Sequence, residues 1–279
     1  MKSEVSLVKT KTGISYYCYN DLIGFYLKNN IEDDYEINKI TEFYLSDKKG
    51  TVIDVGANIG SYLIPLAKKF PNLFFKAFEV QKKIQETLMR NIKINNIKNC
   101  QTFNFGLSSI KKKKIISMPN YLTEKNIGGF SIDSLTRNNN YEVSDSLNKE
   151  TLLLDRLDSS NFKKVILIKL DVEGHELDVL KGSRNTIIKN NYPLIIFEAF
   201  QRVEFKNKIN KLFTFLKKFK YKIIRINSNC IAYAHDNYKM EFINAYIREV
   251  NLKNSFNPNQ GIHYNSKQLY LACKRKFFG

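Results

Sequence analysis

The chain has 279 residues, of which 43% are hydrophobic and 13% aromatic, enough to bury the core of one large α/β domain with additions. No run approaches the roughly 18 apolar residues of a membrane span, and the first residues lack the apolar segment of a secretory signal. The four cysteines are far apart and show no C-x-x-C spacing, which argues against a zinc site or a disulfide framework. The sequence therefore predicts a protein of the reducing cytoplasm.

The net charge of +18 raises the question of nucleic-acid binding. Most of the excess is lysine spread along the chain together with Asn and Ile, a pattern that suits an AT-rich genome whatever the function. The one tight block, Lys111 to Lys114, is expected to be a solvated face of a hairpin. We therefore expect non-specific adhesion to polyanions at low salt rather than specific nucleic-acid binding.

The first 48 residues are expected to form an extension that precedes the main domain. Residues 4–19 alternate between apolar and polar on both sides of Lys11-Thr12-Gly13, which predicts a small hairpin. Residues 34–45 carry apolar side chains at helical spacing and stop near Gly50, which predicts a helix.

From residue 49 to about 240, expected strands alternate with expected helices. The strands cover 51–55, 73–79, 101–106, 113–118, 151–154, 165–170, 194–197, 221–226 and 230–235, and the helices cover 59–69, 81–95, 176–190 and 205–219. This alternation predicts an α/β fold with a mostly parallel sheet and helices on both faces. Residues 241–279 form a basic tail whose role the sequence leaves open.

A polar insertion at 119–148 interrupts this order. It is rich in Asn, Ser, Gly and Thr and contains Gly128-Gly129. An insertion of this length inside a compact fold is usually either a lid or a disordered loop. We expect it to cover the acceptor site, with the two glycines as hinge points.

The most informative stretch is Thr51–Gly60, where a β-branched run ends in Asp54 and leads into a glycine-bracketed turn. Gly56 and Gly60 predict a turn from strand to helix in which a ligand lies against bare backbone. The next expected strand ends in Glu79, at the distance of about 20 residues where an acid can hold the two hydroxyls of a ribose. These residues predict a site for a nucleoside-containing cofactor.

The spacing of the turn favours S-adenosylmethionine (SAM) over a dinucleotide. A dinucleotide site uses G-x-G-x-x-G, but no glycine lies between Gly56 and Gly60, and no Gly-Lys-Ser/Thr follows as in a phosphate-binding P-loop. The carboxylate of Asp54 would repel a phosphate. It would attract the sulfonium and ammonium groups of SAM.

Four expected strands end in a carboxylate, and ligands of open α/β sheets bind beyond the carboxyl ends of the strands. The four acids are Asp54, Glu79, Asp171 and Glu198. Asp171 is expected where the sulfonium faces the substrate, and Glu173 points the same way because side chains alternate along a strand.

Structural interpretations of the neighbouring residues remain open. Glu176 suits the first turn of a helix, where its charge complements the dipole, and His175 suits an exposed turn. Glu173 is also suited to accepting backbone hydrogen bonds, and Glu198 to pairing with Arg202.

The chain resembles the FkbM-type family of SAM-dependent methyltransferases between about residues 50 and 200. The motifs that carry the resemblance are DVGANIG at 54–60, AFE at 77–79, N-x-x-x-N from Asn91 to Asn95, LDRL at 154–157, KLDVEGHELDVLKG at 169–182 and PLIIFE at 193–198. The most specific element is the D-V-E-G-x-E block followed by V-L-x-G. The resemblance implies a seven-stranded class I, Rossmann-like methyltransferase fold that acts mostly on hydroxyl oxygens of sugars or other small metabolites.

The resemblance also implies roles for individual residues. The residues that would shape the methionine end of the SAM site are Asp54, Gly56, Asn58, Ile59 and Gly60. Glu79 would bind the ribose beside Val80, which stands where the family commonly has proline, and Gly106 would flank the adenine. The residues that would face the reaction centre are Asp171, Glu173 and Glu176.

The sequence thus predicts a SAM-dependent methyltransferase that O-methylates a sugar or another small metabolite. A hydroxyl is a poor nucleophile at neutral pH, so a general base or a metal should assist. Asp171 or His175 is the expected base, with Glu173 orienting it. A divalent metal held by Asp171 and Glu198 is a second hypothesis, because acids on adjacent strand tips can hold a hard cation.

Three other interpretations use the same residues. An NAD-dependent reductase would also place Glu79 on a ribose, but the third glycine and a Tyr-x-x-x-Lys-like pair are lacking. A nucleic-acid (RNA) methyltransferase would add the lysine-rich surface to the same cofactor site. A non-catalytic SAM-binding module would not need the acids between Asp171 and Glu176. The sequence leaves open whether the protein is a homo-oligomer.

Overall fold

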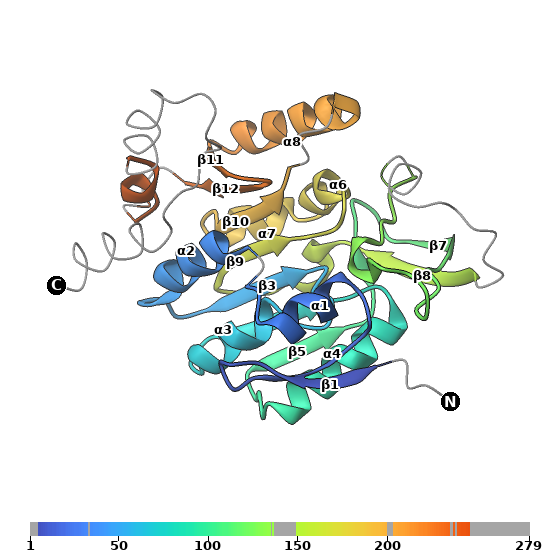
Figure 1. Ribbon diagram of the computed structural model, residues 1–279. Helices are drawn as coiled ribbons and strands as arrows, with labels where there is room; N and C mark the ends of the chain where they lie inside the picture. Colours follow the sequence, from blue (N-terminus) through green and yellow to red (C-terminus); the bar gives the residue numbers. More distant parts are fainter. Residues whose placement is uncertain are drawn as a thin grey trace, which may run out of the picture.

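The computed structural model describes residues 5–32, 34–134, 136, 149–199, 203–234, 237 and 239–245. Its centre is a seven-stranded sheet in the order β11-β12-β10-β9-β3-β4-β5 (Figure 1). The strands are β3 (Thr51–Val55), β4 (Phe74–Phe78), β5 (Cys100–Phe103), β9 (Val165–Leu170), β10 (Leu194–Glu198), β11 (Lys222–Ile226) and β12 (Asn229–Tyr233). Within this sheet β12 is antiparallel to both neighbours and the other adjacent pairs are parallel. The predicted class I fold is confirmed.

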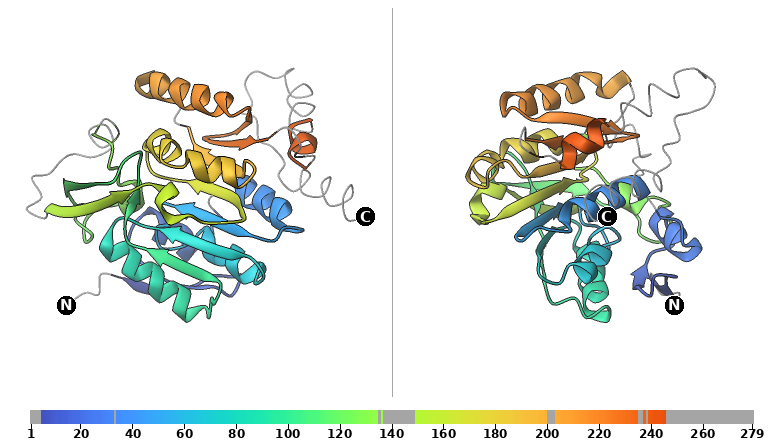
Figure 2. Two further views of the ribbon diagram at one scale, coloured as in Figure 1. Left: turned by 180° about the vertical axis from the view of Figure 1, so that it is seen from behind. Right: turned by 90° about the vertical axis from the view of Figure 1, so that its left-hand side faces the viewer.

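Helices cover both faces of the large sheet (Figures 1 and 2). One face carries α2 (Tyr35–Leu45), α3 (Leu63–Lys69) and α4 (Lys82–Ile94), and the other carries α6 (Glu176–Lys181), α7 (Arg184–Lys189) and α8 (Lys206–Lys218). Side chains of strand β10 point alternately to the two faces. Leu194 and Ile196 pack in the core under α2, α3 and α4, whereas Ile195 and Phe197 pack in the core under α6, α7 and α8. Strands of a parallel sheet that are covered on both faces are mostly apolar, which is why β3, β9 and β10 are nearly continuous apolar runs.

Three of the expected elements differ in detail. The expected helix at 176–190 is two helices that meet near Gly182, where the chain passes so close to Ser108 that an added Cβ would lie 2.0 Å from its carbonyl oxygen. The expected helix at 59–69 begins only at Leu63, since the preceding residues still belong to the turn after β3. The expected strand at 101–106 ends at Phe103, and the chain then enters a second sheet.

The N-terminal extension consists of the expected hairpin and helix α2, with a further helix between them. The hairpin strands are β1 (Ser6–Lys9) and β2 (Ser15–Cys18). Helix α1 (Leu22–Asn29) was not predicted, although Asp21 caps it by accepting a 2.9 Å hydrogen bond from Gly24 N. Its aromatic residues and internal glycine have low helix propensity, so the sequence signal is weak.

A small three-stranded sheet stands beside the large one. It contains β6 (Gly106–Leu107), β7 (Lys112–Ser117) and β8 (Lys149–Asp155), with β8 in the middle. The predicted insertion lies between β7 and β8, and its two expected hinge glycines belong to the 3-10 turn η1 (Ile127–Gly129). Two further 3-10 turns are η2 (Leu157–Ser160) and η3 (Val203–Phe205).

Some predictions fall outside the described residues. These are the insertion from 137 to 148, the basic tail from 246 onward and the pairing of Glu198 with Arg202. Among the helices that are described, none combines the length and the apolar character needed to cross a bilayer.

Candidate functional site

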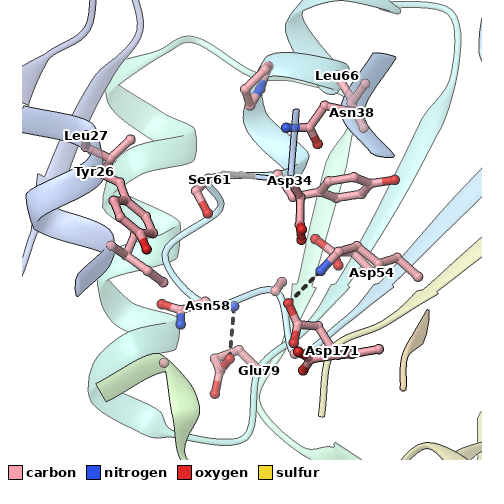
Figure 3. Close-up of a pocket in the computed structure, with 18 of the residues that line it drawn as sticks. Tyr26, Leu27, Asp34, Asn38, Asp54, Asn58, Ser61, Leu66, Glu79 and Asp171 are labelled. Atoms are coloured by element: carbon pink, nitrogen blue, oxygen red, sulfur yellow. Dashed lines mark hydrogen bonds and ion pairs between the residues drawn. The ribbon is translucent and has the colours of Figure 1, made fainter. Parts of the chain in front are cut away.

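A cavity of about 840 Å³ opens at the carboxyl ends of β3, β4, β9 and β10 (Figure 3). This volume lies within the range of about 300–1,000 Å³ that is typical of ligand pockets. The predicted site residues that line it are Asp54, Gly56, Asn58, Glu79, Val80, Gly106, Asp171, Glu173 and Glu198. The structure thus brings the four strand-end acids to one cavity, as parallel strands require.

The turn after β3 is shaped by two residues with left-handed backbone. Gly56 has a φ of +81°, and an added Cβ would lie 1.8 Å from the carbonyl oxygen of Asp171, so only glycine fits. Asn58 has a φ of +49° and donates from its backbone N–H to Glu79 Oε2 at 3.0 Å. The other carboxylate oxygen of Glu79 accepts from Gln81 N at 2.8 Å. Glu79 is therefore fixed in place beside the turn.

Burial raises the pKa of Glu79 to about 7, an effect that its backbone hydrogen bonds only partly oppose. The side chain is 5% exposed and lines the cavity. A carboxyl held in this way can accept hydrogen bonds from the hydroxyls of a ligand.

Asp54 is the least satisfied acid of the cavity. It is 1% exposed, and neither carboxylate oxygen has a hydrogen-bond partner within the part of the chain that the structure describes. Burial raises its pKa to about 6, while the charge of Lys169 acts in the opposite direction. An unpartnered buried carboxyl is costly, so this position favours a ligand that carries a donor or a positive charge.

Lys169 is a site residue that the sequence reasoning did not assign. It is 6% exposed, its Nζ lies 2.8 Å from Asp171 Oδ2, and the same atom lies 4.9 Å from the ring centroid of Tyr62. Burial lowers the pKa of Lys169, but the charges of Asp171 and Asp54 outweigh burial, so the net shift is upward. The sequence signal was a lysine inside the otherwise apolar strand β9, two residues before Asp171.

Three carboxylates gather at the ends of β9 and β10. One oxygen each from Asp171, Glu173 and Glu198 lies within 4.8 Å of the others. Burial and the charge of Asp171 raise the pKa of Glu173 to about 9 and that of Glu198 to about 8. Like charges this close must share protons or bind a cation.

The loop that carries Glu173 is held from outside. Glu173 has a backbone φ of +50°, which is unusual for a glutamate. Its carbonyl accepts a 2.6 Å hydrogen bond from Ser131 Oγ of the insertion. The insertion therefore contacts the acidic loop directly.

The structure places two predicted reaction-centre residues away from the lining of this cavity. His175 is 8% exposed, shares a 3.1 Å hydrogen bond with Ser108 Oγ, and has a pKa lowered by burial to about 4. Glu176 accepts from Gly174 N at 2.9 Å and is 4% exposed. His175 is thus not an exposed turn residue and does not line the cavity, and Glu176 stabilises its own turn.

Two residues of the turn motif also serve packing rather than the cavity wall. Ile59 is buried in an apolar cluster with Tyr19, Tyr121 and Ile127. At Gly60, with φ +91°, an added Cβ would lie 2.8 Å from both Ile64 and Leu88. The second glycine of the motif therefore allows α3 and α4 to approach the turn.

Much of the remaining wall comes from segments that the motifs did not cover. Helix α1 contributes Tyr26 and Leu27, which face the turn after β3 (Figure 3). Asp34, with φ +50°, also lines the cavity and accepts a 2.8 Å hydrogen bond from Asn229 Nδ2. The insertion contributes Phe130 and its neighbours, in agreement with its expected position over the site.

Comparisons with known proteins agree with this arrangement. A family profile described as "Methyltransferase FkbM domain" matches residues 54–223, more than half of the chain. The protein named Methyltransferase 1 of Beauveria bassiana (strain ARSEF 2860) is 28% identical over 144 residues, which are 47% of this chain and 57% of that protein. The chain thus spans a little over half the length of this curated relative.

Two solved structures have a similar arrangement of elements. TYW2 of M. jannaschii, in complex with AdoMet, is 13% identical with a TM-score of 0.39, and the match covers 83% of this chain and 84% of that chain. The human methyltransferase 10 domain containing protein is 10% identical with a TM-score of 0.40, covering 72% and 79%. The fold class itself rests on the strand order of the large sheet.

Proposed function

The chain belongs to the FkbM methyltransferase family, as its motifs predicted, and we propose that it transfers the methyl group of SAM to a hydroxyl oxygen of a sugar or another small metabolite. The observation that carries the proposal is the pair of buried acids at one cavity, Asp54 without a hydrogen-bond partner among the described residues and Glu79 fixed by backbone N–H groups. Together they suit a ligand with a cationic end and a ribose.

The cofactor would lie across the ends of β3 and β4. Its methionine end would contact Asp54, Gly56 and Asn58, and its ribose hydroxyls would donate to Glu79. The adenine would lie near Val80 and Gly106. The support for this placement is that all six residues line one continuous cavity and that Gly56 leaves room for close approach to the backbone.

The acceptor hydroxyl would meet the methyl group at the ends of β9 and β10. Methyl transfer is an in-line displacement, so most of the catalysis is the alignment of oxygen, carbon and sulfur. Asp171, held by Lys169, would orient the hydroxyl, and the adjacent Glu173 or Glu198 would take its proton. We give His175 no part in this step, because its imidazole is bound to Ser108.

The same three carboxylates fit a hard divalent cation, which prefers oxygen ligands. Asp171, Glu173 and Glu198 would hold it, and it would lower the pKa of a bound hydroxyl. The pH dependence of turnover and its response to EDTA distinguish a carboxylate base from a bound cation. Without a cation, turnover should rise from pH 7 to 9 as the carboxyls with pKa values of about 8 and 9 lose their protons. With a cation, EDTA should abolish turnover.

The proposal is tested by following methyl transfer from labelled SAM to a panel of sugars and other hydroxyl compounds. The expected result is a labelled ether product with at least one acceptor. Label found instead on RNA, with binding that survives moderate salt, would favour the nucleic-acid alternative. Label on neither class, despite SAM binding, would indicate a non-catalytic module and contradict the proposal.

A further inference from the structure

The N-x-x-x-N motif of α4 has no part in the proposed chemistry, yet its two asparagines make a dense set of contacts. The side chain of Asn91 is completely buried. Its Oδ1 accepts from Tyr17 N at 2.6 Å, and its Nδ2 donates to Tyr17 O at 3.0 Å. Asn95 repeats this pattern with Ser15, accepting from its N–H at 3.0 Å and donating to its carbonyl at 2.7 Å.

These two asparagines therefore take the place of a third strand beside β2. Strand β1 pairs with one edge of β2, and α4 lies along the other. Residues four apart on a helix are separated by about 6 Å along its axis, and residues two apart on a strand by about 6.6 Å. Side-chain amides at Asn91 and Asn95 can thus match the backbone of Ser15 and Tyr17 in register. Figure 2 shows the hairpin lying along this helix.

Asn91 differs from Asn95 in one further contact. Its Nδ2 also donates to Ile59 O at 2.9 Å, and Ile59 belongs to the cofactor turn. The corresponding Nδ2 of Asn95 donates instead to Asn91 O within α4, at 2.8 Å. A single buried amide therefore joins the turn that would hold SAM to the N-terminal hairpin.

The hairpin in turn fixes part of the cavity wall. The chain continues from β2 into α1, and Tyr26 and Leu27 of this helix line the cavity. Packing reinforces the connection, because Cys18 and Tyr19 share an apolar cluster with Ile59 of the turn. The matched family domain begins at residue 54, so this wall lies outside it.

We propose that Asn91 is a positioning residue that couples the cofactor turn to the N-terminal segment, residues 5–32, so that this part of the cavity wall becomes ordered when the cofactor binds. The proposal rests on the proposed function, because it takes residues 56–61 as part of the SAM site. Cofactor bound at the turn would restrict Ile59, and Asn91 would pass that restriction to β2 and α1. This part of the cavity wall would then be complete only when the cofactor is in place.

The test uses hydrogen–deuterium exchange of the full chain with and without S-adenosylhomocysteine (SAH). In the wild type, saturating SAH should slow exchange in peptides that cover residues 12–30 by about tenfold. A tenfold slowing corresponds to a rise in the free energy of local opening that is similar to the net contribution of one hydrogen bond. Peptides from β10 serve as the reference for global stability. The wild-type comparison decides the point even if a variant fails to fold, since SAH binding without slower exchange at 12–30 would overturn the coupling.

Asn91→Ala and Asn95→Ala form a matched pair. Both should speed the basal exchange of residues 12–30, because each removes two hydrogen bonds to the hairpin. Only Asn91→Ala should also lose the SAH-dependent slowing and weaken SAH binding by about five- to tenfold in calorimetry. An undiminished response to SAH in Asn91→Ala, or an equal loss in Asn95→Ala, would overturn the proposed role. A wild type that binds no SAH would instead overturn the proposed function, and the coupling with it.

Discussion

The two sides of the cavity hold their carboxylates in different ways. On the side of β3 and β4, Glu79 accepts hydrogen bonds from two backbone N–H groups and cannot easily move. On the side of β9 and β10, Asp171, Glu173 and Glu198 face one another within 4.8 Å, with Lys169 paired to the first of them. Preorganised acceptors suit the binding of a cofactor, whereas a crowded group of acids in which Glu173 and Glu198 have raised pKa values suits proton transfer or the capture of a cation.

This contrast explains why the two sides should respond differently to substitution. Changes on the first side should act on the binding of SAM. Changes on the second side should act on turnover and on its pH dependence, because the protonation of each crowded acid depends on the protonation of the others.

The largest effect is expected for Asp171→Asn, which keeps the shape of the side chain and removes its charge. We expect turnover to fall by about 10²–10⁴-fold, the range for loss of a group that assists proton transfer, while SAM affinity changes by less than about tenfold. Labelled methyl transfer and calorimetry measure the two quantities. Asp178→Asn in α6, where the side chain is 38% exposed and pairs with Lys181, is the matched control, and turnover near wild type for Asp171→Asn would remove this residue from the mechanism.

Lys169→Met should give the next largest effect, on stability. Removing the buried cation leaves Asp54 and Asp171 without their partner charge. Breaking a fully buried ion pair costs about 3–5 kcal/mol, and the loss here should be smaller because the Asp171 side chain is 44% exposed. Thermal unfolding followed by circular dichroism measures the loss. Lys76→Met in β4, where the ammonium contacts Gln101 at an exposed site, should cost far less. Equal losses in the two variants would contradict a central role for Lys169.

Glu79→Gln should weaken SAM binding by about 5–30-fold, because hydrogen bonds to a charged acceptor are stronger than those to an amide by about 1–2 kcal/mol. At saturating SAM the turnover should remain within a few-fold of wild type, since the change lies on the binding side of the cavity. Glu86→Gln on the exposed face of α4 controls for the substitution itself. A variant that loses turnover but binds SAM normally would reverse the assignment of the two sides.

The smallest effect concerns the pH dependence of stability. The folded pKa values of Asp54, Glu79, Glu198 and Glu173, about 6, 7, 8 and 9, lie above the ordinary values of 3.8 for Asp and 4.5 for Glu. The folded state therefore holds more protons than the unfolded state over this range. The stability that these groups contribute is complete below about pH 4 and is lost as the pH rises through 6 to 9.

We accordingly expect the melting temperature of the ligand-free protein to fall by a few degrees between pH 6 and pH 9. Glu198→Gln should flatten this decline, because its side chain no longer ionises. A melting temperature that rises over the same interval in the wild type would show that the acids are not protonated in the folded protein.

The sequence predicted the large sheet well because its strands carry a local signal. Buried parallel strands are continuous apolar runs, and the acids at their ends mark where the runs stop, so β3, β9 and β10 were found within a residue or two. The gathering of Asp54, Glu79, Asp171 and Glu198 followed from the rule that parallel strand ends share one edge.

The parts that escaped prediction depend on contacts between distant segments. The break between α6 and α7 lies where Gly182 approaches Ser108. The buried His175 forms its hydrogen bond with the side chain of Ser108. Helix α1 is stabilised by its contacts with the insertion, where Leu22 N–H donates a hydrogen bond to the carbonyl of Lys125, rather than by its intrinsic helix propensity. Lys169 was visible in the sequence, but its role emerges only when β3 and β9 lie side by side.

The most direct test of the account is a calorimetric titration of the full chain with SAM and, separately, with NAD. The turn from Asp54 to Gly60 and the fixed Glu79 should give saturable binding of SAM and no measurable heat with NAD at the same concentrations. Binding of NAD as tight as that of SAM, or no binding of SAM at all, would contradict the claim that this acid-lined cavity holds a cationic adenosyl donor.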